Sequence, residues 1–312
     1  ASLPVGRAGI LQTGVDWVRH TSGGVAENRL AAFGSAAGET PALLLEASVR
    51  AETWSTESGT RSQLVPRAGV NIKRILHHTL RLKMSAGRSW TVPSLIDRYW
   101  VPGGNPNLQP ETGWSGDIGL HFGSNRVELE ITGFSATLND RIVWIPSLVG
   151  SGVQVWRATN VGKVNTYGLE TSAAGEVRLR DEAVVKGGLS VAYTEARDRS
   201  DPAAASYGHQ VKYTPRTVVH ASTGLEIGRF ELGVTGHLVG KRYITTDESS
   251  SLPSYVVVDG RASYEVWVGP LSTTLSFTAE NLLDRSYSTI RFYPMPPRHF
   301  GFGLNLEWRK SK

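Results

Sequence analysis

The chain has 312 residues, of which 40% are hydrophobic and 20% charged, and this balance excludes an intrinsically disordered protein. It has no cysteine, which excludes a disulfide framework, a thiol nucleophile and a cysteine-ligated metal. Its net charge of +5 is scattered along the chain without a basic stripe, so we expect no nucleic-acid partner. No run reaches the roughly 18 consecutive apolar residues of a transmembrane helix.

Apolar and polar residues alternate along most of the chain, and this period of two is typical of β-strands. Within residues 127–131, Val127, Leu129 and Ile131 alternate with Glu128 and Glu130. The same period recurs, in chain order, in residues 185–193, 219–227, 230–238, 256–266 and 271–278. Charged residues in such strands are costly toward hydrocarbon and cheap toward a wet lumen. The pattern therefore fits strands between lipid and a lumen, although a soluble β-sandwich shows similar alternation.

The last strand carries this pattern without a break. Its apolar positions are Phe300, Phe302, Leu304, Leu306 and Trp308. Small or polar residues, namely Gly301, Gly303, Asn305 and Glu307, occupy the positions between them. We therefore expect the five apolar residues to face lipid and the others to face a lumen.

The connections between the expected strands alternate strictly between short and long. Short turns are expected near 37–40, 73–76, 123–125, 180–181, 227–229 and 269–270, and longer connections near 55–63, 88–111, 140–162, 198–214, 242–253 and 284–297. Transmembrane barrels keep this order because their periplasmic turns are tight and their extracellular loops are long. The sequence therefore predicts an all-β fold, an antiparallel transmembrane β-barrel of about 14 strands.

Short motifs lie in and beside the long connections. In chain order they are Ser85–Leu95 with Tyr99–Trp100, Gly104–Thr112, Asn160–Gly162 with Tyr167–Glu170, Leu252–Tyr255, Glu280–Asp284 with Tyr287, and Tyr293–Pro296 with Arg298 and Phe300. Each motif alone is ordinary turn chemistry. Together, in this order and at these spacings, they resemble the motifs of TonB-dependent outer-membrane receptors along nearly the whole chain.

The resemblance implies a bacterial outer-membrane location and a plugged barrel of about 22 strands. Such receptors also have an N-terminal plug and a short segment that binds TonB. With about 14 strands, residues 1–308 look like the C-terminal portion of this barrel, followed by a short basic tail at 309–312. The resemblance further implies that the terminal strand is the signal for barrel assembly.

Three arrangements are open. In the first, a second chain or segment supplies the remaining strands and the plug; in the second, the strands of this chain close on themselves; in the third, this chain is a fragment of a longer protein. We favour an N-terminal part that lies on another chain or is absent from this one, since unpaired strand edges in hydrocarbon are costly. TonB would then be reached only through that part, while outer-membrane lipid and lipopolysaccharide surround the barrel.

We expect no enzyme, because no catalytic constellation stands out, and we expect no cofactor and no metal site. Gly301-Phe302-Gly303 lacks the third glycine of a dinucleotide loop, and His77-His78 has no partner at metal-ligand spacing. Ligand contacts are expected from aromatic and arginine side chains in the long loops. The candidates are Arg98, Tyr99, Trp100, Trp144, Trp156 and Arg157. The alternative for each aromatic residue is a place in the interfacial girdle.

The resemblance implies a function in the uptake of a scarce metal chelate, such as a ferric siderophore, or of cobalamin. Two other functions stay open at this point. One is a structural or scaffolding barrel that has lost transport, and the other is a self-closed passive channel of about 14 strands.

Overall fold

The computed structural model describes residues 2–5, 9–22, 24–149, 153–180 and 183–308. Its elements are, in chain order, β1 (Ser2–Val5), β2 (Gly9–Ser22), β3 (Val25–Glu39), β4 (Leu43–Thr56), β5 (Gly59–Lys73), β6 (Leu80–Thr91), α1 (Leu95–Tyr99), β7 (Glu111–Gly123), β8 (Val127–Val149), β9 (Val153–Arg180), β10 (Ala183–Asp198), β11 (Thr217–Ile227), β12 (Phe230–Val239), β13 (Arg242–Tyr243), β14 (Ser251–Leu252), β15 (Tyr255–Val268), β16 (Leu271–Glu280), β17 (Ser288–Ile290), β18 (Tyr293–Pro294) and β19 (His299–Trp308).

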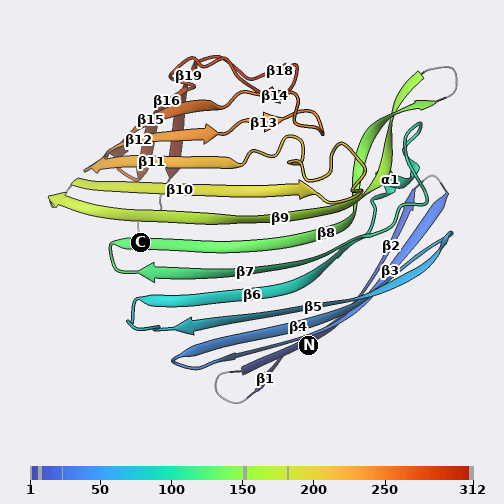
Figure 1. Ribbon diagram of the computed structural model, residues 1–312. Helices are drawn as coiled ribbons and strands as arrows, with labels where there is room; N and C mark the ends of the chain where they lie inside the picture. The colour runs from blue at the N-terminus through green and yellow to red at the C-terminus, as the bar shows by residue number, and fades with distance from the viewer. Residues whose placement is uncertain (1, 6–8, 23, 150–152, 181–182, 309–312) are drawn as a thin grey trace. The chain divides into compact units, whose positions relative to one another are not determined.

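Fifteen of these strands form one sheet in which neighbours in the chain are neighbours in space (Figure 1). Its order runs from β1 to β12 and then through β15 and β16 to β19. The pairs β13–β14 and β17–β18 form two small sheets within the connections. The predicted all-β antiparallel fold is confirmed, and β1 is the strand beyond the expected 14 or so.

No helix among the described residues is long and apolar enough to cross a membrane.

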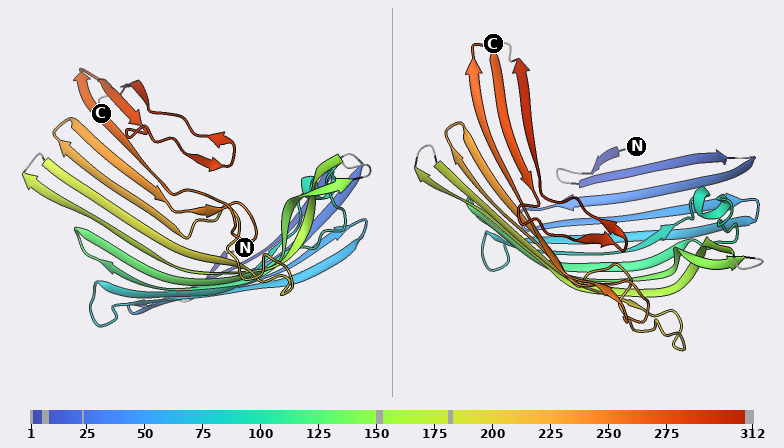
Figure 2. Two further views of the ribbon diagram at one scale, coloured as in Figure 1. Left: turned by 45° about the horizontal axis from the view of Figure 1, so that its top comes forward. Right: turned by 90° about the horizontal axis from the view of Figure 1, so that it is seen from above.

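The chain divides into two compact units. The first comprises Ala1–Leu120, Gly133–Tyr167 and Ala196–Gly208, and the second comprises His121–Thr132, Gly168–Glu195 and His209–Lys312. In the first unit, α1 lies beside the ends of β8 and β9 in both views of Figure 2.

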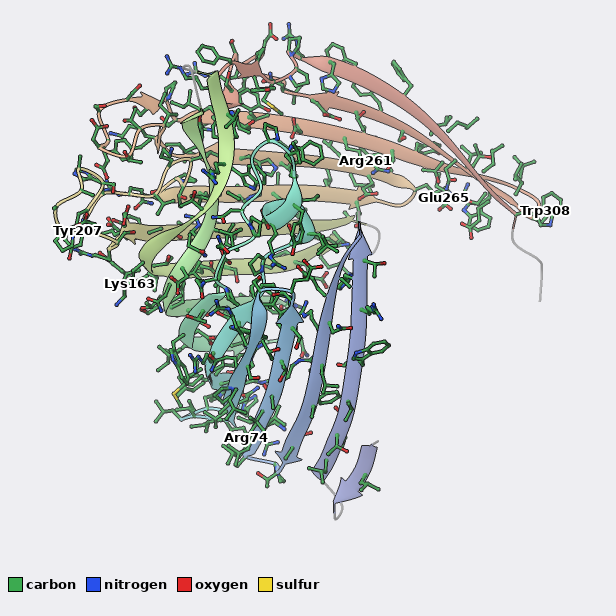
Figure 3. All side chains as sticks on the ribbon, turned by 90° about the vertical axis from the view of Figure 1, so that its right-hand side faces the viewer. Arg74, Lys163, Tyr207, Arg261, Glu265 and Trp308 are labelled. Carbon is green, nitrogen blue, oxygen red and sulfur yellow. The ribbon has the colours of Figure 1, made fainter. Side chains whose placement is uncertain are left out.

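The second unit has one apolar and one polar sheet face. The register places Leu275 opposite Leu304 and Phe277 opposite Phe302, so these side chains share a face. They are exposed, and Phe302 retains 86% of its accessible surface. Trp308 lies at the C-terminal end of the same strand (Figure 3). This exposed apolar face is what a strand in contact with lipid requires.

The loop rhythm is largely as predicted. Short connections follow β3, β5, β7, β11 and β15, and long connections follow β6, β10, β12 and β16. The turn expected near 180–181 reaches Asp181, and the basic tail at 309–312 follows Trp308; both extend outside the described residues.

Two expected long connections are wrong. Residues 55–63 form a hairpin with only Glu57 and Ser58 between strands, because polar residues pair across it: the Thr60 hydroxyl donates to Ser55 Oγ at 3.0 Å. Residues 140–162 belong mostly to β8 and β9, whose β-branched and aromatic residues continue the strands.

Candidate ligand-binding loops

The connection between β6 and β7, residues 92–110, carries three of the candidate residues. Its helix α1 begins with a capping box, in which Ser94 Oγ accepts the Asp97 N–H at 3.1 Å and Asp97 Oδ2 accepts the Ser94 N–H at 3.0 Å. The helix ends before Trp100, whose backbone is extended. Because the helix ends at Tyr99, the Arg98 side chain is buried while the Trp100 side chain is exposed.

Arg98 is buried, with 1% of its surface accessible, and forms an ion pair with Glu27 of β3. Its Nε and Nη2 donate to the Pro106 carbonyl at 3.2 and 3.1 Å, and Nη2 also donates to Ser58 Oγ at 3.2 Å. One guanidinium therefore ties the loop to itself, to β3 and to the β4–β5 turn.

Two aromatic rings accompany this guanidinium. Its central carbon lies 5.0 Å from the Trp54 ring centroid and 4.7 Å from that of Tyr99. Trp54 Nε1 in turn donates to Glu27 Oε2 at 3.2 Å. Burial raises the pKa of the Tyr99 phenol, and the positive charge of Arg98 acts in the opposite direction.

The β8–β9 hairpin supplies the other three candidates and packs against this loop. Trp144 Nε1 donates to Asp97 Oδ1 at 2.9 Å, and the Ala158 N–H donates to the Gly103 carbonyl at 2.9 Å. Only glycine fits at Gly103, because a Cβ there would lie 1.7 Å from the Trp156 carbonyl oxygen. The structure therefore brings the loop and hairpin candidates together.

The candidate side chains differ in exposure. Trp100 and Trp156 are 61% and 62% exposed, and Arg157 is exposed as well. Tyr99 and Trp144 are half-buried. Ligand contact by these residues stays a prediction, whereas the contacts of Arg98 suit a residue that positions the loop.

Asn160 holds the end of the loop, and sequence reasoning noted it only as part of a motif. Its Oδ1 accepts the Gln109 N–H at 2.8 Å, while its Nδ2 donates to the Gln109 and Asp140 carbonyls at 2.9 and 2.6 Å. Nearby, Glu111 Oε1 accepts the Ile142 N–H at 2.6 Å. The side chains of Asn160 and Glu111 therefore hold the backbone of the loop and of the β8–β9 hairpin together.

A second set of loops gathers in the second unit around Glu248. Its Oε1 accepts the Gln210 N–H at 2.7 Å and lies 3.5 Å from Arg216 Nη2 and 3.8 Å from His209 Nδ1. Burial by itself would raise the pKa of Glu248, but the Gln210 N–H and the charge of Arg216 lower it below its ordinary value. This carboxylate joins the connection 199–216 to the connection 240–254.

Arg242 and Asn281 fix the remaining loops of the second unit. Arg242 donates to the Ser288 and Pro253 carbonyls at 3.1 and 3.0 Å. Asn281 Oδ1 accepts the Arg285 N–H at 2.8 Å, and its Nδ2 donates to two loop carbonyls. Sequence reasoning missed Arg242 and Glu27 and noted Glu248 only as part of an acidic loop, because the partners of these residues are distant along the chain.

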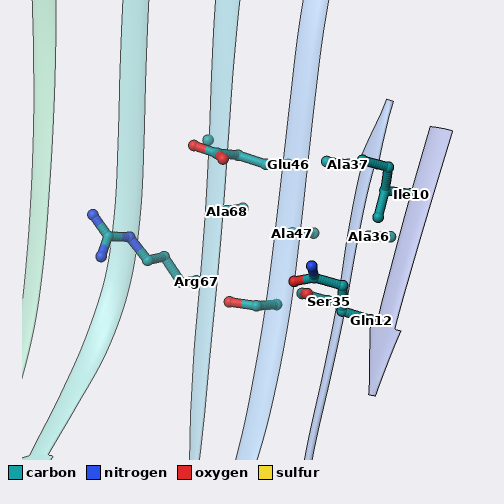
Figure 4. Close-up of a pocket in the computed structure, with 11 residues that line it drawn as sticks. Ile10, Gln12, Ser35, Ala36, Ala37, Glu46, Ala47, Arg67 and Ala68 are labelled. Atoms are coloured by element: carbon teal, nitrogen blue, oxygen red, sulfur yellow. The ribbon is translucent and has the colours of Figure 1, made fainter. Parts of the chain in front are cut away.

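A hollow of about 360 Å³ lies on the polar face of β2–β5 (Figure 4). Gln12, Ser35, Glu46, Ser48 and Arg67 are among the residues that line it. Glu46 extends over Gly69, where a Cβ would come within 2.9 Å of Glu46 Oε1. Glycine on the neighbouring strand therefore makes room for a charged side chain on this face.

An antiparallel sheet with an exposed apolar face, tight turns and long, internally fixed loops is typical of outer-membrane β-barrel proteins. Residues 4–282 match the family model described as TonB dependent receptor-like, beta-barrel. The chain therefore belongs to the TonB-dependent receptor β-barrel family, and like its homologues it is a bacterial outer-membrane protein.

Individual relatives agree with this assignment. The vitamin B12 transporter BtuB of Vibrio vulnificus (strain YJ016) is 26% identical over 205 residues, covering 66% of this chain and 30% of the relative. The structure of the copper transporter OprC superposes with a TM-score of 0.75 at 17% identity, covering 96% of this chain and 54% of that one. A variant of the ferric enterobactin receptor PfeA from Pseudomonas aeruginosa superposes with a TM-score of 0.74 at 17% identity, covering 97% and 52%. These two likenesses show the fold, and the chain spans about half or less of each relative.

Proposed function

We propose that this chain is the barrel portion of a TonB-dependent transporter that takes up a scarce metal chelate, such as a ferric siderophore, or cobalamin. The observation that carries the proposal is the assembly of the 92–110 loop and the β8–β9 hairpin, which presents Trp100, Trp156 and Arg157 at its surface. Relatives named as vitamin B12 transporters and a ferric enterobactin receptor support this substrate class.

The exposed side chains suit such a ligand chemically. Indole rings stack on flat ligand rings and attract cations, while an exposed guanidinium attracts anionic groups in a fixed geometry. Arg98 and Asn160 would hold these groups in place without touching the ligand. Capture at the loops would then precede passage through the barrel.

The partners belong to the proposal as well. A plug and the early strands would come from a separate chain or segment, and TonB would act through that part alone. The charged hollow on the polar face of β2–β5 supports contact with a plug, since Glu46 and Arg67 offer both signs of charge there. The apolar face would contact outer-membrane lipid and lipopolysaccharide.

We favour transport over a scaffolding barrel or a self-closed passive channel, because the matched proteins are named as transporters and receptors. Uptake tests this choice. Uptake of labelled cobalamin and of a panel of ferric siderophores is measured in cells that lack the whole protein and in cells that produce it. Both kinds of cell are tested with and without TonB. We expect one substrate to enter only when both proteins are present. Uptake that persists without TonB would reject active transport, and no change for any substrate would reject transport altogether.

A further inference from the structure

Two histidines face each other on neighbouring strands of the second unit. His220 of β11 and His237 of β12 are directly opposite in the register. Their ring centroids are 4.1 Å apart, and the rings meet edge to face at 79°. His220 is exposed and His237 is half-buried, so both rings are accessible.

The pair results from a tight turn and a shared period. Only Gly228 and Arg229 separate β11 from β12, and this short connection fixes the register. Both histidines lie on the polar face, since Val219 and Leu238, which are also opposite each other, take the apolar face. The pair lies two residue positions from the open end of the hairpin, where Val218 is opposite Val239 and the long connections begin.

The ring nitrogens of His220 and His237 are available to bind a ligand. Neither imidazole makes a side-chain hydrogen bond or an ion pair within the part of the chain that the structure describes. Directly opposed side chains on antiparallel strands have Cβ atoms about 4.5–5.5 Å apart, which is a span that two imidazoles can close around one ion. Rotation of the two rings about their side-chain torsions would turn one nitrogen of each toward a common point.

We propose that His220 and His237 form a two-imidazole site for a divalent transition-metal ion. Imidazole suits Cu²⁺, Zn²⁺ and Ni²⁺, and among these Cu²⁺ binds most tightly to a given nitrogen site. No group of three or more potential ligands surrounds the pair among the described residues, so water or the ion's own ligands complete the coordination. Such an open site suits reversible binding on the polar face, close to the loops. The proposal does not rest on the transport function.

Ring packing without metal binding is the competing explanation, and variants separate the two. His220→Ala and His237→Ala each remove one ligand and one ring, whereas His237→Phe keeps an aromatic ring in contact and removes only the nitrogens. His77 and His78 provide a matched control, because their rings are also 4.1 Å apart but lie in the turn after β5. His78→Ala should therefore leave metal binding unchanged.

The test uses the whole protein, purified in detergent and titrated with Cu²⁺ alone. Calorimetry should give one equivalent bound at micromolar concentration, and electron paramagnetic resonance should show two nitrogen ligands. All three variants at the pair should weaken binding at least tenfold while keeping the heat-modifiable gel mobility of a folded barrel. If a variant fails to fold, the electron paramagnetic resonance spectrum of the unaltered protein remains the test, and a spectrum without two nitrogen ligands would reject the site. Absence of binding, equal binding by His237→Phe, or loss of binding in His78→Ala would overturn the proposal.

Discussion

The guanidinium of Arg98 is ion-paired with the carboxylate of Glu27 in a setting where both side chains are buried. This pair connects the loop after β6 to β3, and the Trp54 and Tyr99 rings flank the guanidinium. A buried ion pair contributes little net stability relative to an apolar pair, but the loss of one partner leaves a charge without compensation. The loop therefore depends on both residues together.

Arg98→Ala should release the 92–110 loop from the strands. The cavity left by the guanidinium and the unpaired Glu27 carboxylate should lower the free energy of local unfolding by about 3–5 kcal/mol. Hydrogen exchange of the loop, measured by mass spectrometry, reports this change directly. Arg157→Ala is the matched control, because Arg157 is exposed. Equal exchange in the two variants would show that the ion pair does not hold the loop.

Asn160→Ala should loosen the same loop at its other end. The substitution removes the partners of the Gln109 N–H and of the Gln109 and Asp140 carbonyls. The bonds to Gln109 are part-buried and the bond to Asp140 is exposed, so each unpaired Gln109 group costs at most about 1–3 kcal/mol and the Asp140 carbonyl less. Limited proteolysis should cut the variant within the loop much faster than the unaltered protein. Asn107→Ala serves as the control, and equal cleavage of both variants would argue against the role of Asn160.

Substitution of both Phe302 and Trp308 by Asp should prevent membrane assembly. Both side chains are exposed on the apolar face, where a carboxylate would face hydrocarbon. We expect the amount of heat-modifiable protein in the outer membrane to fall at least about tenfold. Asn305→Asp, on the opposite face of β19, should assemble normally. Normal insertion of the double variant would reverse our orientation of this strand.

Much of the fold could be predicted because one physical period governs it. A side-chain period of two set the faces of β11, β12 and β19, and turn residues such as Gly228 marked the short connections. The same reasoning failed at residues 140–162, where it expected a long connection, whereas β8 and β9, which are neighbours in the sheet, extend over most of this range. Composition reports local preference, whereas pairing of the hairpin arms decides where a strand ends.

The candidate site could be predicted only in part. Trp100 and Trp156, which the sequence offered as candidates because they are aromatic residues in long connections, are exposed, and their segments are joined. Ligand contact by these two residues stays a prediction. The burial of Arg98 could not be foreseen, because its partner Glu27 lies 71 residues away. Long-range ion pairs leave no local pattern in a sequence. The opposed His220 and His237 were visible as polar-face residues, but only the register pairs them.

The loop 240–254 should respond to acid through Asp247. Hydrogen bonds from the Ser249 hydroxyl and N–H, at 2.7 and 3.1 Å, help to lower the pKa of Asp247 to about 2. Because the folded-state pKa is below the ordinary value of 3.8, the turn is stabilised above that pH and loses this stabilisation as the pH falls toward about 2. The carboxyl carbon shift of labelled aspartate should titrate accordingly. Ser249→Ala should bring the midpoint back toward 3.8. An ordinary midpoint in the unaltered protein would contradict the hydrogen-bonded turn.

In the proposed function, the loop surface beside α1 would capture the substrate before its import. Trp100→Ala combined with Trp156→Ala removes the two exposed rings, while the Arg98 and Asn160 contacts stay intact. The decisive measurement compares binding of the labelled substrate by de-energised cells with its uptake by energised cells, at matched amounts of surface protein. We predict that binding weakens at least about tenfold, since stacking and apolar contact with two indoles are lost, and that uptake at low substrate concentration falls with it. Binding and uptake equal to those of the unaltered protein would contradict the account.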